Sequence, residues 1–450
     1  MTGMDIGSVF QGKKVTVMGL GLLGRGVGDA AYLAEMGAEV IVTDLKTEDE
    51  LAESVLMLRD YANITFVLGE HRLRDFRDRD FILKAAGVPL DSPYIAEAEQ
   101  HTIPVRMSAA MFAKLSGVPM IGVTGTRGKS TVTHMIYHVL REITEDTGNG
   151  GVVLGGNVRG VSNLQLLKEV GEDSLAVFEL DSWQLQGFGV EEISPQISVF
   201  TNFMSDHLNY YQNDIEAYFK DKAQIFLHQN SHDVFVTTPH VLEVANAYAK
   251  KYGLTFGGEV LLTDVSILPE DIVLAMPGKH NRLNAALAVT ALRALSLPDE
   301  LIFAGLSTFQ GVPGRLELLR EYRGVKIYND NNATTPEATR EGLQAVAVKK
   351  NVILIMGGAD KGLDLEGLVS DLSAYAKEVV MIPGTGTDRM RERMVGAEYV
   401  DTLREALAAA LAKAENGDVV LFSPAFASFG QFSNEYERND MFVEQVSFLT

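Results

Sequence analysis

The 450-residue sequence contains no cysteine, which excludes disulfide bonds, thiolate metal ligands and cysteine nucleophiles. It has no apolar run long enough to span a membrane, and its first ten residues, MTGMDIGSVF, lack the basic start and long apolar core of a signal peptide. Positive charge is scarce, because 39 Lys and Arg stand against 60 Asp and Glu, a net charge of −21. We therefore expect a cytoplasmic protein that binds neither nucleic acid nor a membrane, and that holds any phosphate ligand with local loops and a few cations.

Short apolar segments alternate with helical patterns along the whole chain, which predicts an α/β protein with parallel sheets and right-handed crossovers. The chain is too long for one ordinary core. We expect a Rossmann-like domain over residues 1–110, a central P-loop domain with a parallel sheet over 111–311, and a Rossmann-like α/β domain over 312–450. Strands are expected at 14–18, 39–43, 81–83, 104–107, 120–123, 175–178, 196–200, 325–328, 352–356, 379–382 and 419–422, and helices at 215–228, 280–295 and 402–414.

The segment GTRGKST follows a buried-type strand and precedes an apolar pattern of helical spacing. Its glycines let the backbone N–H groups surround phosphates, and the new helix adds its positive N-terminal end. Lys129 would meet the outer phosphates, and Ser130 or Thr131 would offer a hydroxyl to magnesium. The glycines are closer together than in the common P-loop, so this is a variant loop, and a simple surface turn is the alternative. The residues of the predicted ATP loop are Gly125, Thr126, Arg127, Gly128, Lys129, Ser130 and Thr131.

A second glycine motif, GLGLLG at residues 19–24, directly follows the first expected strand. Asp44 lies twenty residues after the last glycine, at the end of the next expected strand. This spacing is typical of dinucleotide-binding folds, in which the acid bonds a ribose hydroxyl. NAD binding and a glycine turn needed only for close packing both remain open at this point.

Polar residues follow two expected strands of the central domain, where the loops of a parallel sheet line a ligand crevice. Glu179 stands where a P-loop protein needs a second magnesium ligand, His207 lies in the loop after residues 196–200, and Lys222 lies on the next expected helix. His134 and His138 are four residues apart on the P-loop helix, but no Glu lies between them, so we interpret this pair as structural rather than as a zinc site.

Taken together, these motifs resemble the Mur ligase family, and within it the members that add D-glutamate. The matches run in the family's order across almost the whole chain. In addition to the P-loop and Lys222, they comprise Gly155-Gly156-Asn157, Glu179 to Leu185, Thr201-Asn202, Asp206-His207-Leu208, His280-Asn281 with Asn284, Pro313-Gly314-Arg315, Asn329-Asp330, Gly357 to Gly362 and Ser423 to Phe429.

The resemblance implies an ATP-dependent ligase of peptidoglycan precursor synthesis that joins D-glutamate to UDP-N-acetylmuramoyl-L-alanine through an acyl-phosphate, and we expect a monomer. It implies ATP, two magnesium ions and a Lys222 that reacts with carbon dioxide to form a carbamate. Catalysis and metal binding would fall to Lys129, Ser130, Glu179, His207 and Lys222. ATP would also contact Asn281, Asn284, Arg315 and Asp330; the UDP substrate would contact Leu22, Leu23, Asp44 and Asn157; the amino acid would contact Thr334, Lys361 and Ser428.

Several positions depart from the family's usual pattern and concern amino-acid specificity or the UDP site. They are Asp181 for a frequent serine, Gly314 for a histidine, Asn331-Asn332 for Ser-Lys, Glu435 for an aromatic residue, and Lys84 to Gly87 for Ser-Pro-Gly. The alternatives are therefore a sister ligase with another amino acid, or folylpolyglutamate synthetase. From other classes, the alternatives are an NAD-dependent dehydrogenase and a non-catalytic nucleotide-binding module.

Overall fold

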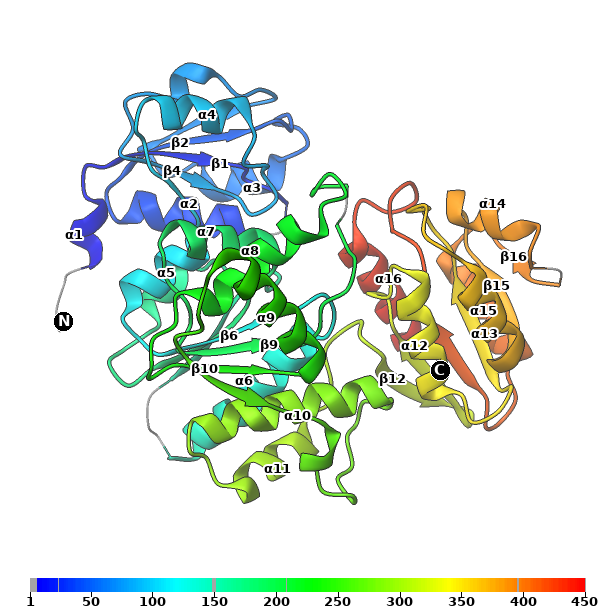
Figure 1. The fold of residues 1–450 in the computed structure, drawn as a ribbon. Helices are drawn as coiled ribbons and strands as arrows, with labels where there is room; N and C mark the ends of the chain where they lie inside the picture. The colour runs from blue at the N-terminus through cyan, green and yellow to red at the C-terminus, as the bar shows by residue number, and fades with distance from the viewer. Residues whose placement is uncertain (1–5, 23, 148–150, 208, 395, 450) are drawn as a thin grey trace. The chain divides into compact units, whose positions relative to one another are not determined.

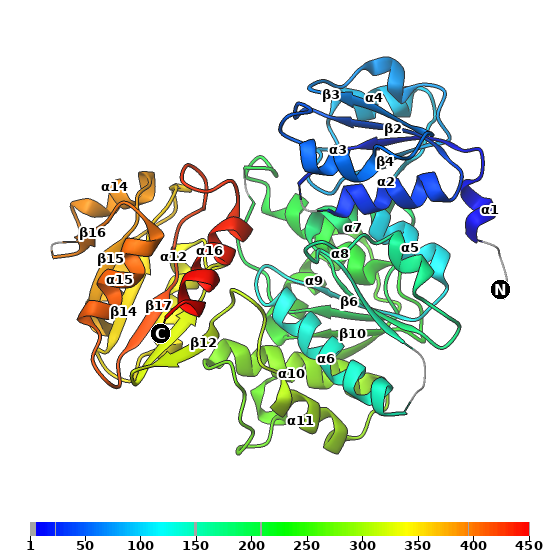
Figure 2. The same ribbon diagram turned by 180° about the vertical axis from the view of Figure 1, so that it is seen from behind.

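Figure 1 and Figure 2 show the computed structural model, which describes residues 6–22, 24–147, 151–207, 209–394 and 396–449. The chain divides into two compact units. The first comprises Met1–Ile267 and Ala286–Ile302, and the second comprises Leu268–Ala285 and Phe303–Thr450. The first unit holds two β-sheets and the second unit holds one. None of the helices among the described residues is both long and apolar enough to cross a membrane.

The N-terminal sheet of the first unit is five-stranded and entirely parallel, in the order β3-β2-β1-β4-β5. Its central strand β1 buries Val15 and Val17 completely or nearly so, as a strand covered on both faces must. The strands are β1 (Lys14–Met18), β2 (Glu39–Asp44), β3 (Ile64–Leu68), β4 (Phe81–Lys84) and β5 (Val105–Arg106), and the helices are α1 (Ile6–Phe10), α2 (Arg25–Glu35), α3 (Ala52–Leu58), η1 (Leu73–Phe76) and α4 (Pro93–Gln100).

The second sheet of this unit is six-stranded and also parallel, in the order β11-β10-β9-β6-β8-β7. The strands are β6 (Met120–Thr124), β7 (Val152–Gly156), β8 (Leu175–Glu179), β9 (Ile197–Phe200), β10 (Val234–Thr237) and β11 (Glu259–Leu262). The helices are α5 (Ser108–Ser116), α6 (Lys129–Thr147), η2 (Gln165–Lys168), α7 (Ser182–Val190), α8 (Ile215–Leu227), α9 (Pro239–Tyr252) and η3 (Val265–Ile267). Two more helices, α10 (Lys279–Ala294) and α11 (Asp299–Thr308), each have residues in both units.

The order of this second sheet determines where the functional loops meet. Strand β6 lies between β8 and β9, with Val123 opposite Glu179 and Thr124 opposite Phe200. Because all three strands are parallel, the loops that follow them leave from the same edge of the sheet. The edge therefore gathers the GTRGKST loop, Glu179 and the segment that leads to His207.

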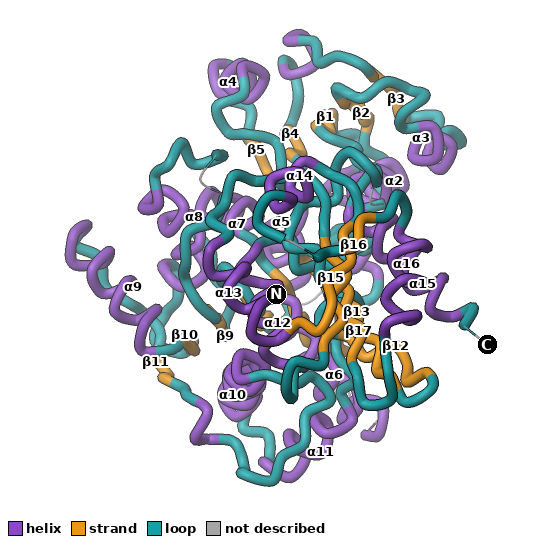
Figure 3. Tube along the Cα trace, turned by 90° about the vertical axis from the view of Figure 1, so that its right-hand side faces the viewer, coloured by secondary structure: helices purple, strands orange, loops and turns teal. Residues whose placement is uncertain are grey.

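The sheet of the second unit is mixed, in the order β12-β13-β17-β14-β15-β16. Figure 3 shows its strands with α12 and α13 on one side and α15 and α16 on the other. Apolar side chains of each helix pair pack on the face that they cover, so the unit has two cores. The elements are β12 (Glu317–Tyr322), β13 (Val325–Asn329), α12 (Pro336–Val346), β14 (Val352–Met356), α13 (Glu366–Tyr375), β15 (Ala376–Met381), α14 (Thr385–Arg391), β16 (Glu398–Tyr399), α15 (Leu403–Lys413), β17 (Val419–Phe422) and α16 (Glu435–Ser447).

The three-part α/β fold is as the sequence predicts, with one difference in the last sheet. There a wholly parallel sheet was expected, but β12 pairs antiparallel with β13 through a hairpin at its edge. The hairpin turn has positive φ at Arg323 (53°) and Gly324 (77°), the geometry of a two-residue I′ turn. The sequence does not predict this turn, because its first turn residue is Arg323, whereas type I′ turns usually have Asn or Asp at that position. The predicted domain boundaries stay a prediction.

Candidate active site

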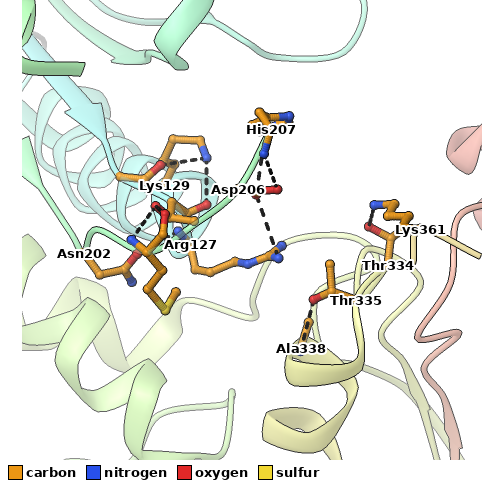
Figure 4. Close-up of polar contacts among 12 residues, drawn as sticks. Arg127, Lys129, Asn202, Asp206, His207, Thr334, Thr335, Ala338 and Lys361 are labelled. Atoms are coloured by element: carbon orange, nitrogen blue, oxygen red, sulfur yellow. Dashed lines mark hydrogen bonds and ion pairs between the residues drawn. The ribbon is translucent and has the colours of Figure 1, made fainter. Parts of the chain in front are cut away.

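The GTRGKST loop connects β6 to α6 and is held by the loop after β9. Both glycines have positive φ, 146° at Gly125 and 81° at Gly128. A β-carbon on Gly125 would lie 1.9 Å from Thr201 Oγ1, so only glycine fits there. The Thr126 N–H donates to Asn202 O (2.9 Å), and the Arg127 N–H donates to Asn202 Oδ1 (2.8 Å). These contacts hold the loop backbone in place, as Figure 4 shows for Arg127 and Asn202.

The amino group of Lys129 folds back over this loop. Its Nζ donates to Gly125 O at 3.1 Å and to Thr126 O at 3.2 Å (Figure 4). Ser130 and Thr131 follow in the first turn of α6 and are about 95% buried. The Lys129 ammonium is carried by a long side chain and lies next to two hydroxyls at a helix N-terminus. It can therefore leave the two carbonyl oxygens and bind phosphate oxygens instead.

Glu179 ends β8 beside this loop and is 3% exposed. Its Oε1 accepts a hydrogen bond from Asn157 Nδ2 at 3.3 Å. Asn157 in turn accepts from Arg25 NH1 through its Oδ1 at 2.6 Å, and its own N–H donates to Glu179 O at 2.8 Å. A continuous polar chain therefore runs from the first residue of α2 to the sheet edge where the P-loop begins.

His207 lies in the loop after β9 with a left-handed backbone (φ 52°). Its Nε2 is 3.8 Å from Asp206 Oδ2, which also lies 3.9 Å from Arg127 NH2 (Figure 4). The Trp183 ring packs on the imidazole with 4.9 Å between centroids. Burial lowers the pKa of His207, helped by the charges of Lys129 and Lys222 and opposed by Asp206. The neutral ring that results is the form of histidine that binds metal ions.

Lys222 is a lysine buried in α8, 1% exposed and without a carboxylate within ion-pair distance among the described residues. Its Nζ donates to Gly125 O at 2.8 Å and to Thr124 Oγ1 at 3.4 Å, and lies 4.9 Å from the centre of the Tyr218 ring. Burial lowers its pKa well below the usual value for lysine, and the charge of Lys129 lowers it further. The structure therefore brings Lys222 to the P-loop backbone in a site that disfavours an ammonium ion.

These residues fit magnesium bound together with phosphates rather than an ion held by protein alone. The part of the chain that the structure describes contains no cluster of three or more His, Asp, Glu or Cys side chains that could hold a metal. Magnesium is usually bound by one or two carboxylates, a hydroxyl and substrate phosphates, and it keeps several waters. Glu179 and Ser130 offer the required hard oxygen donors at the loop that would carry those phosphates.

The GLGLLG loop of the N-terminal sheet lines a cavity of about 490 Å³. Asp44 supports this loop, because its Oδ2 accepts from the N–H groups of Leu20 (2.8 Å) and Gly21 (3.1 Å). Its carboxylate is thus engaged with the backbone of the loop and helps to fix the conformation of the loop. Leu22 is half-exposed on the cavity wall, and Leu23 lies outside the described residues.

In the second unit, Asp330 directly follows β13 and is 8% exposed. Ser423 Oγ donates to its Oδ2 at 2.8 Å, and the Leu316 N–H donates to its Oδ1 at 3.1 Å. Burial raises the pKa of Asp330 to about 7, against these hydrogen bonds and the nearby charges of His280 and Arg315. The hydrogen bond from Leu316, the residue after Arg315, connects the two residues that the sequence assigns to the ATP site.

The other sequence-predicted residues of this unit fall into two small groups. Asn281 and Asn284 are buried in the first turns of α10, and Asn284 Nδ2 donates to Asn281 Oδ1 at 3.3 Å. Lys361 Nζ donates to Thr334 Oγ1 at 3.0 Å, as Figure 4 shows, whereas Ser428 lies buried after β17. Lys361 and Thr334 are therefore together.

Comparison with known proteins matches three successive segments of the chain to family models. The N-terminal domain of MurD-like Mur ligases matches residues 13–107, the Mur ligase middle domain matches 123–292, and the glutamate ligase domain of Mur ligases matches 314–426. The chain belongs to the Mur ligase family.

Relatives within the family extend over nearly the whole chain. The UDP-N-acetylmuramoylalanine–D-glutamate ligase of Roseiflexus sp. is 35% identical over 98% of this chain and 99% of its own, and the enzyme of that name from Borreliella burgdorferi is 33% identical over 96% and 97%. The crystal structure of UDP-N-acetylmuramate-alanine ligase MurC from Thermotoga maritima has a TM-score of 0.61 at 22% identity over 97% and 99%, which shows the shared fold. Members of this Mur ligase family are ATP-dependent ligases.

The departures from the family pattern acquire local explanations in the structure. Asp181 is the N-cap of α7, where it forms a capping box with Gln184. Gly314 has a φ of 70°, and a β-carbon there would lie 2.8 Å from Asn439 Oδ1, so a larger residue would displace that amide. Asn332 Nδ2 donates to Pro313 O at 3.3 Å, and Asn331 Nδ2 donates to the backbone of Glu435 at 2.9 Å.

Sequence reasoning missed two cations that the fold places at these sites, Arg25 and Arg438, and noted a third, Lys84, only as a departure from the family pattern. Arg438 is completely buried, donating through Nε to Asn331 Oδ1 (2.8 Å) and through NH2 to Asn331 O (3.0 Å), so it supports the loop that carries Thr334. Arg25 and Lys84 line the cavity of the glycine loop. The signal for Arg25 was its place directly after GLGLLG. Arg438 carries no such signal, because an arginine on an amphipathic helix usually faces solvent.

Asp330 leads to a prediction about pH. Its pKa is about 7 in the folded protein and near 4 in the unfolded chain. Between about pH 4 and pH 7 the folded protein therefore keeps a proton on Asp330 that the unfolded chain has lost. The free energy of unfolding falls as the pH rises through this range, because the folded state binds more protons than the unfolded state. From pH 5 to pH 8 we expect wild type to lose about 2–3 kcal/mol relative to Asp330→Asn, which cannot titrate. Hydrogen exchange of the β13 and β17 amides at each pH, corrected for intrinsic rates, measures this change in the free energy of unfolding for both proteins. A pH-independent difference would contradict it.

Proposed function

We propose that this Mur ligase adds D-glutamate to UDP-N-acetylmuramoyl-L-alanine in peptidoglycan precursor synthesis. The observation that carries the proposal is the identity with ligases of that name over nearly the full length of both chains. The variant P-loop and the polar residues at its sheet edge support it, because an NAD-dependent dehydrogenase would leave them without a role. We propose that the protein acts as a monomer in the cytoplasm, without nucleic-acid or membrane partners.

The reaction needs an activated acyl group, which ATP supplies. The substrate carboxylate attacks the γ-phosphorus of ATP, an oxygen–phosphorus bond forms, and ADP leaves. The D-glutamate nitrogen then attacks the acyl carbon, a proton leaves the nitrogen, and inorganic phosphate departs as the amide forms. Lys129 and the N–H groups of the P-loop would stabilise the negative charge that the phosphoryl oxygens carry in both steps.

Magnesium, bound in two positions, would supply positive charge to the phosphates and to the acyl oxygen. Ser130 and Glu179 would hold one ion, and Glu179, His207 and a modified Lys222 would hold the other. The Asn157 amide orients Glu179 by its 3.3 Å hydrogen bond, and the Trp183 ring fixes the plane of His207.

Lys222 would serve as a carbamate. The neutral amine attacks carbon dioxide, a nitrogen–carbon bond forms, one proton leaves, and the side chain becomes an anion. Its Nζ lies against Gly125 O and Thr124 Oγ1 without a carboxylate partner among the described residues, so the unmodified ammonium gains little from this position. The carbamate is implied by the family resemblance, and the buried position of Lys222 supports it.

The cavity of the glycine loop would take the UDP part of the substrate, and Asn157 would contact the muramoyl part. The diphosphate would lie against the N–H groups that follow Gly21, as phosphates do at glycine loops. The wall contributes Leu22 and Arg25, and Asp44 keeps the loop in shape. Leu23, which we propose as a further contact, lies outside the described residues. Lys46, His71 and Lys84 add polar groups that suit an anionic substrate in an acidic protein.

The remaining predicted contacts come from the second unit and α10. Asn281, Asn284, Arg315 and Asp330 would contact ATP, and Thr334, Lys361 and Ser428 would hold D-glutamate. The 3.0 Å hydrogen bond from Lys361 to Thr334 leaves its ammonium beside a hydroxyl, a suitable pair for a carboxylate of the amino acid.

Arg25→Leu tests the UDP site. We expect the KM for the UDP substrate to rise about tenfold with kcat little changed, because the lost guanidinium both lines the cavity and orients Asn157 by its 2.6 Å hydrogen bond. Steady-state phosphate release measures both constants. Arg59→Leu is the matched control, since Arg59 is exposed outside the cavity. A fall in kcat at constant KM would contradict a binding role for Arg25.

Amino-acid specificity is tested by phosphate release from ATP and magnesium with UDP-N-acetylmuramoyl-L-alanine. We expect release with D-glutamate and release at least about a hundredfold slower with L-glutamate, D-aspartate or a diamino acid, because one misplaced carboxylate or amine leaves buried polar groups unpaired. Release with another amino acid in place of D-glutamate would keep the ligase chemistry and overturn the substrate. No release with any of them would overturn the proposed reaction.

A further inference from the structure

His71 is a histidine of the UDP cavity to which the proposed reaction gives no specific partner. It follows β3 and lines the cavity together with Leu45 and Lys46, which follow β2. In dinucleotide-binding folds the phosphates lie at the glycine loop after the first strand, and the ribose lies at the end of the second strand. Here β3 is the next strand on that side of the sheet, in the order β3-β2-β1. A nucleoside diphosphate on the glycine loop would therefore bring its base toward His71.

The contacts of the His71 ring fix its plane and engage one of its two nitrogens. Nδ1 lies 2.8 Å from Oγ1 of Thr43, which is completely buried. The ring packs edge-on against Tyr94, with 5.0 Å between centroids, and against Phe76 at 6.2 Å. Nε2 forms no hydrogen bond among the described residues, and it is not one of their buried atoms without a partner. Because the ring lines the cavity, this accessible nitrogen is available to a ligand there.

The hydrogen bonds of Thr43 decide which nitrogen of His71 carries the proton. The Thr43 hydroxyl donates to Glu70 O at 3.1 Å, and a hydroxyl has a single proton to donate. In the contact with His71 the Nδ1–H is therefore the donor and Thr43 Oγ1 the acceptor, which leaves Nε2 as an acceptor. Burial lowers the pKa of His71, opposed by the charge of Asp44, so the ring is neutral at about pH 8.

The carboxylate of Asp44 is the other side-chain acceptor at this end of the cavity, and both of its oxygens are engaged. Oδ2 accepts from the N–H groups of Leu20 and Gly21, and Oδ1 accepts from the Lys46 N–H at 3.0 Å. His71 Nε2 is thus an acceptor that lacks a donor. Uracil presents a donor, N3–H, in the middle of its Watson–Crick edge, whereas cytosine presents an acceptor at the same position.

We propose that His71 determines the base specificity of the UDP site, because its Nε2 accepts a hydrogen bond from N3–H of uracil. The base would pack against the apolar side chains of Leu45 and Val88, which line the same cavity. Cytosine would place an acceptor against Nε2 and leave both groups unpaired. This inference rests on the proposed function, which places UDP in the cavity.

Binding of UDP and CDP to the full-length protein tests the assignment, with saturating ADP and magnesium present to fill the P-loop. Isothermal titration calorimetry at about pH 8 should show that wild type binds CDP about tenfold more weakly than UDP, or more weakly still. The diphosphate of 3-methyluridine has a methyl group in place of the N3 proton. It should bind as weakly as CDP.

His71→Phe keeps an aromatic ring beside Tyr94 and removes both nitrogens. We expect it to bind UDP about tenfold more weakly and CDP within about twofold of wild type, so that the preference for UDP disappears. His101→Phe is the matched control, because His101 is exposed outside the cavity, and it should keep the wild-type preference.

Two results would overturn the role of His71 and leave the UDP site in place. One is an unchanged preference for UDP in His71→Phe, and the other is an equal loss of UDP and CDP binding, which would indicate a structural role only. Absence of UDP binding to wild type is a different result, since it would overturn the proposed UDP site and this inference with it.

Discussion

Lys129→Ala is expected to lower ATP-dependent phosphate release about a thousandfold or more. The Lys129 amino group rests on Gly125 O and Thr126 O, 3.1 and 3.2 Å away, and it is the mobile cation that the P-loop can turn toward phosphates. In a protein with a net charge of −21, no general positive field replaces it. The backbone N–H groups and the helix N-terminus remain after the substitution, so nucleotide binding should weaken less than turnover.

The matched control for this substitution is Lys114→Ala. Lys114 is half-exposed and forms an ion pair with Glu191 at 2.5 Å, away from the loop, so its removal should leave activity within about twofold. Phosphate release under saturating substrates gives turnover, and titration with a fluorescent ATP analogue gives affinity. If Lys129→Ala kept more than about a tenth of wild-type turnover, the P-loop would not be stabilising the transferred phosphoryl group.

The sequence predicted those parts of the fold in which the hydrophobic pattern of an element agrees with the turn or capping residues that flank it. The buried strand before Gly125 and the amphipathic pattern after Ser130 place the P-loop within one residue. The helix expected at 402–414 is α15 (Leu403–Lys413), which begins with a capping box of Thr402 and Glu405. Short strands with a weak pattern escaped prediction. β7, β10, β11, β12 and β16 have two to six residues each, and they depend on pairing with neighbours for their existence.

The sequence predicted which residues belong to the candidate site, but not which of them contact one another. Parallel strand order places Glu179 beside β6, which follows from βαβ topology. Asp44 accepts hydrogen bonds from the N–H groups of Leu20 and Gly21. These contacts depend on the conformation of the glycine loop, which the spacing between the motif and Asp44 does not determine. The hydrogen bond between Arg25 and Asn157 joins residues 132 positions apart, so only tertiary structure brings them together.

Lys222→Ala is expected to lose activity about a hundredfold to a thousandfold, and to regain part of it with formate or acetate. The reason is geometric: Lys222 is buried beside Gly125 O and Thr124 Oγ1, so alanine leaves a hole that a small carboxylate can enter, and that anion would take the place of the carbamate. Phosphate release with increasing formate measures the rescue. Lys220→Ala is the control, because Lys220 is exposed on the same helix and should show neither loss nor rescue.

Carbon dioxide separates the carbamate from a role of Lys222 as an ammonium ion. If the carbamate is required, wild type assayed in buffer freed of carbon dioxide should lose activity that bicarbonate restores, whereas Lys222→Ala with formate should be indifferent to bicarbonate. An ammonium role predicts the reverse for the alanine protein, namely rescue by small amines and none by carboxylates, since a cation would then have to fill the hole. A fully active Lys222→Ala protein would show that neither charge is needed at this position, and the second metal site would then have to rest on Glu179 and His207 alone.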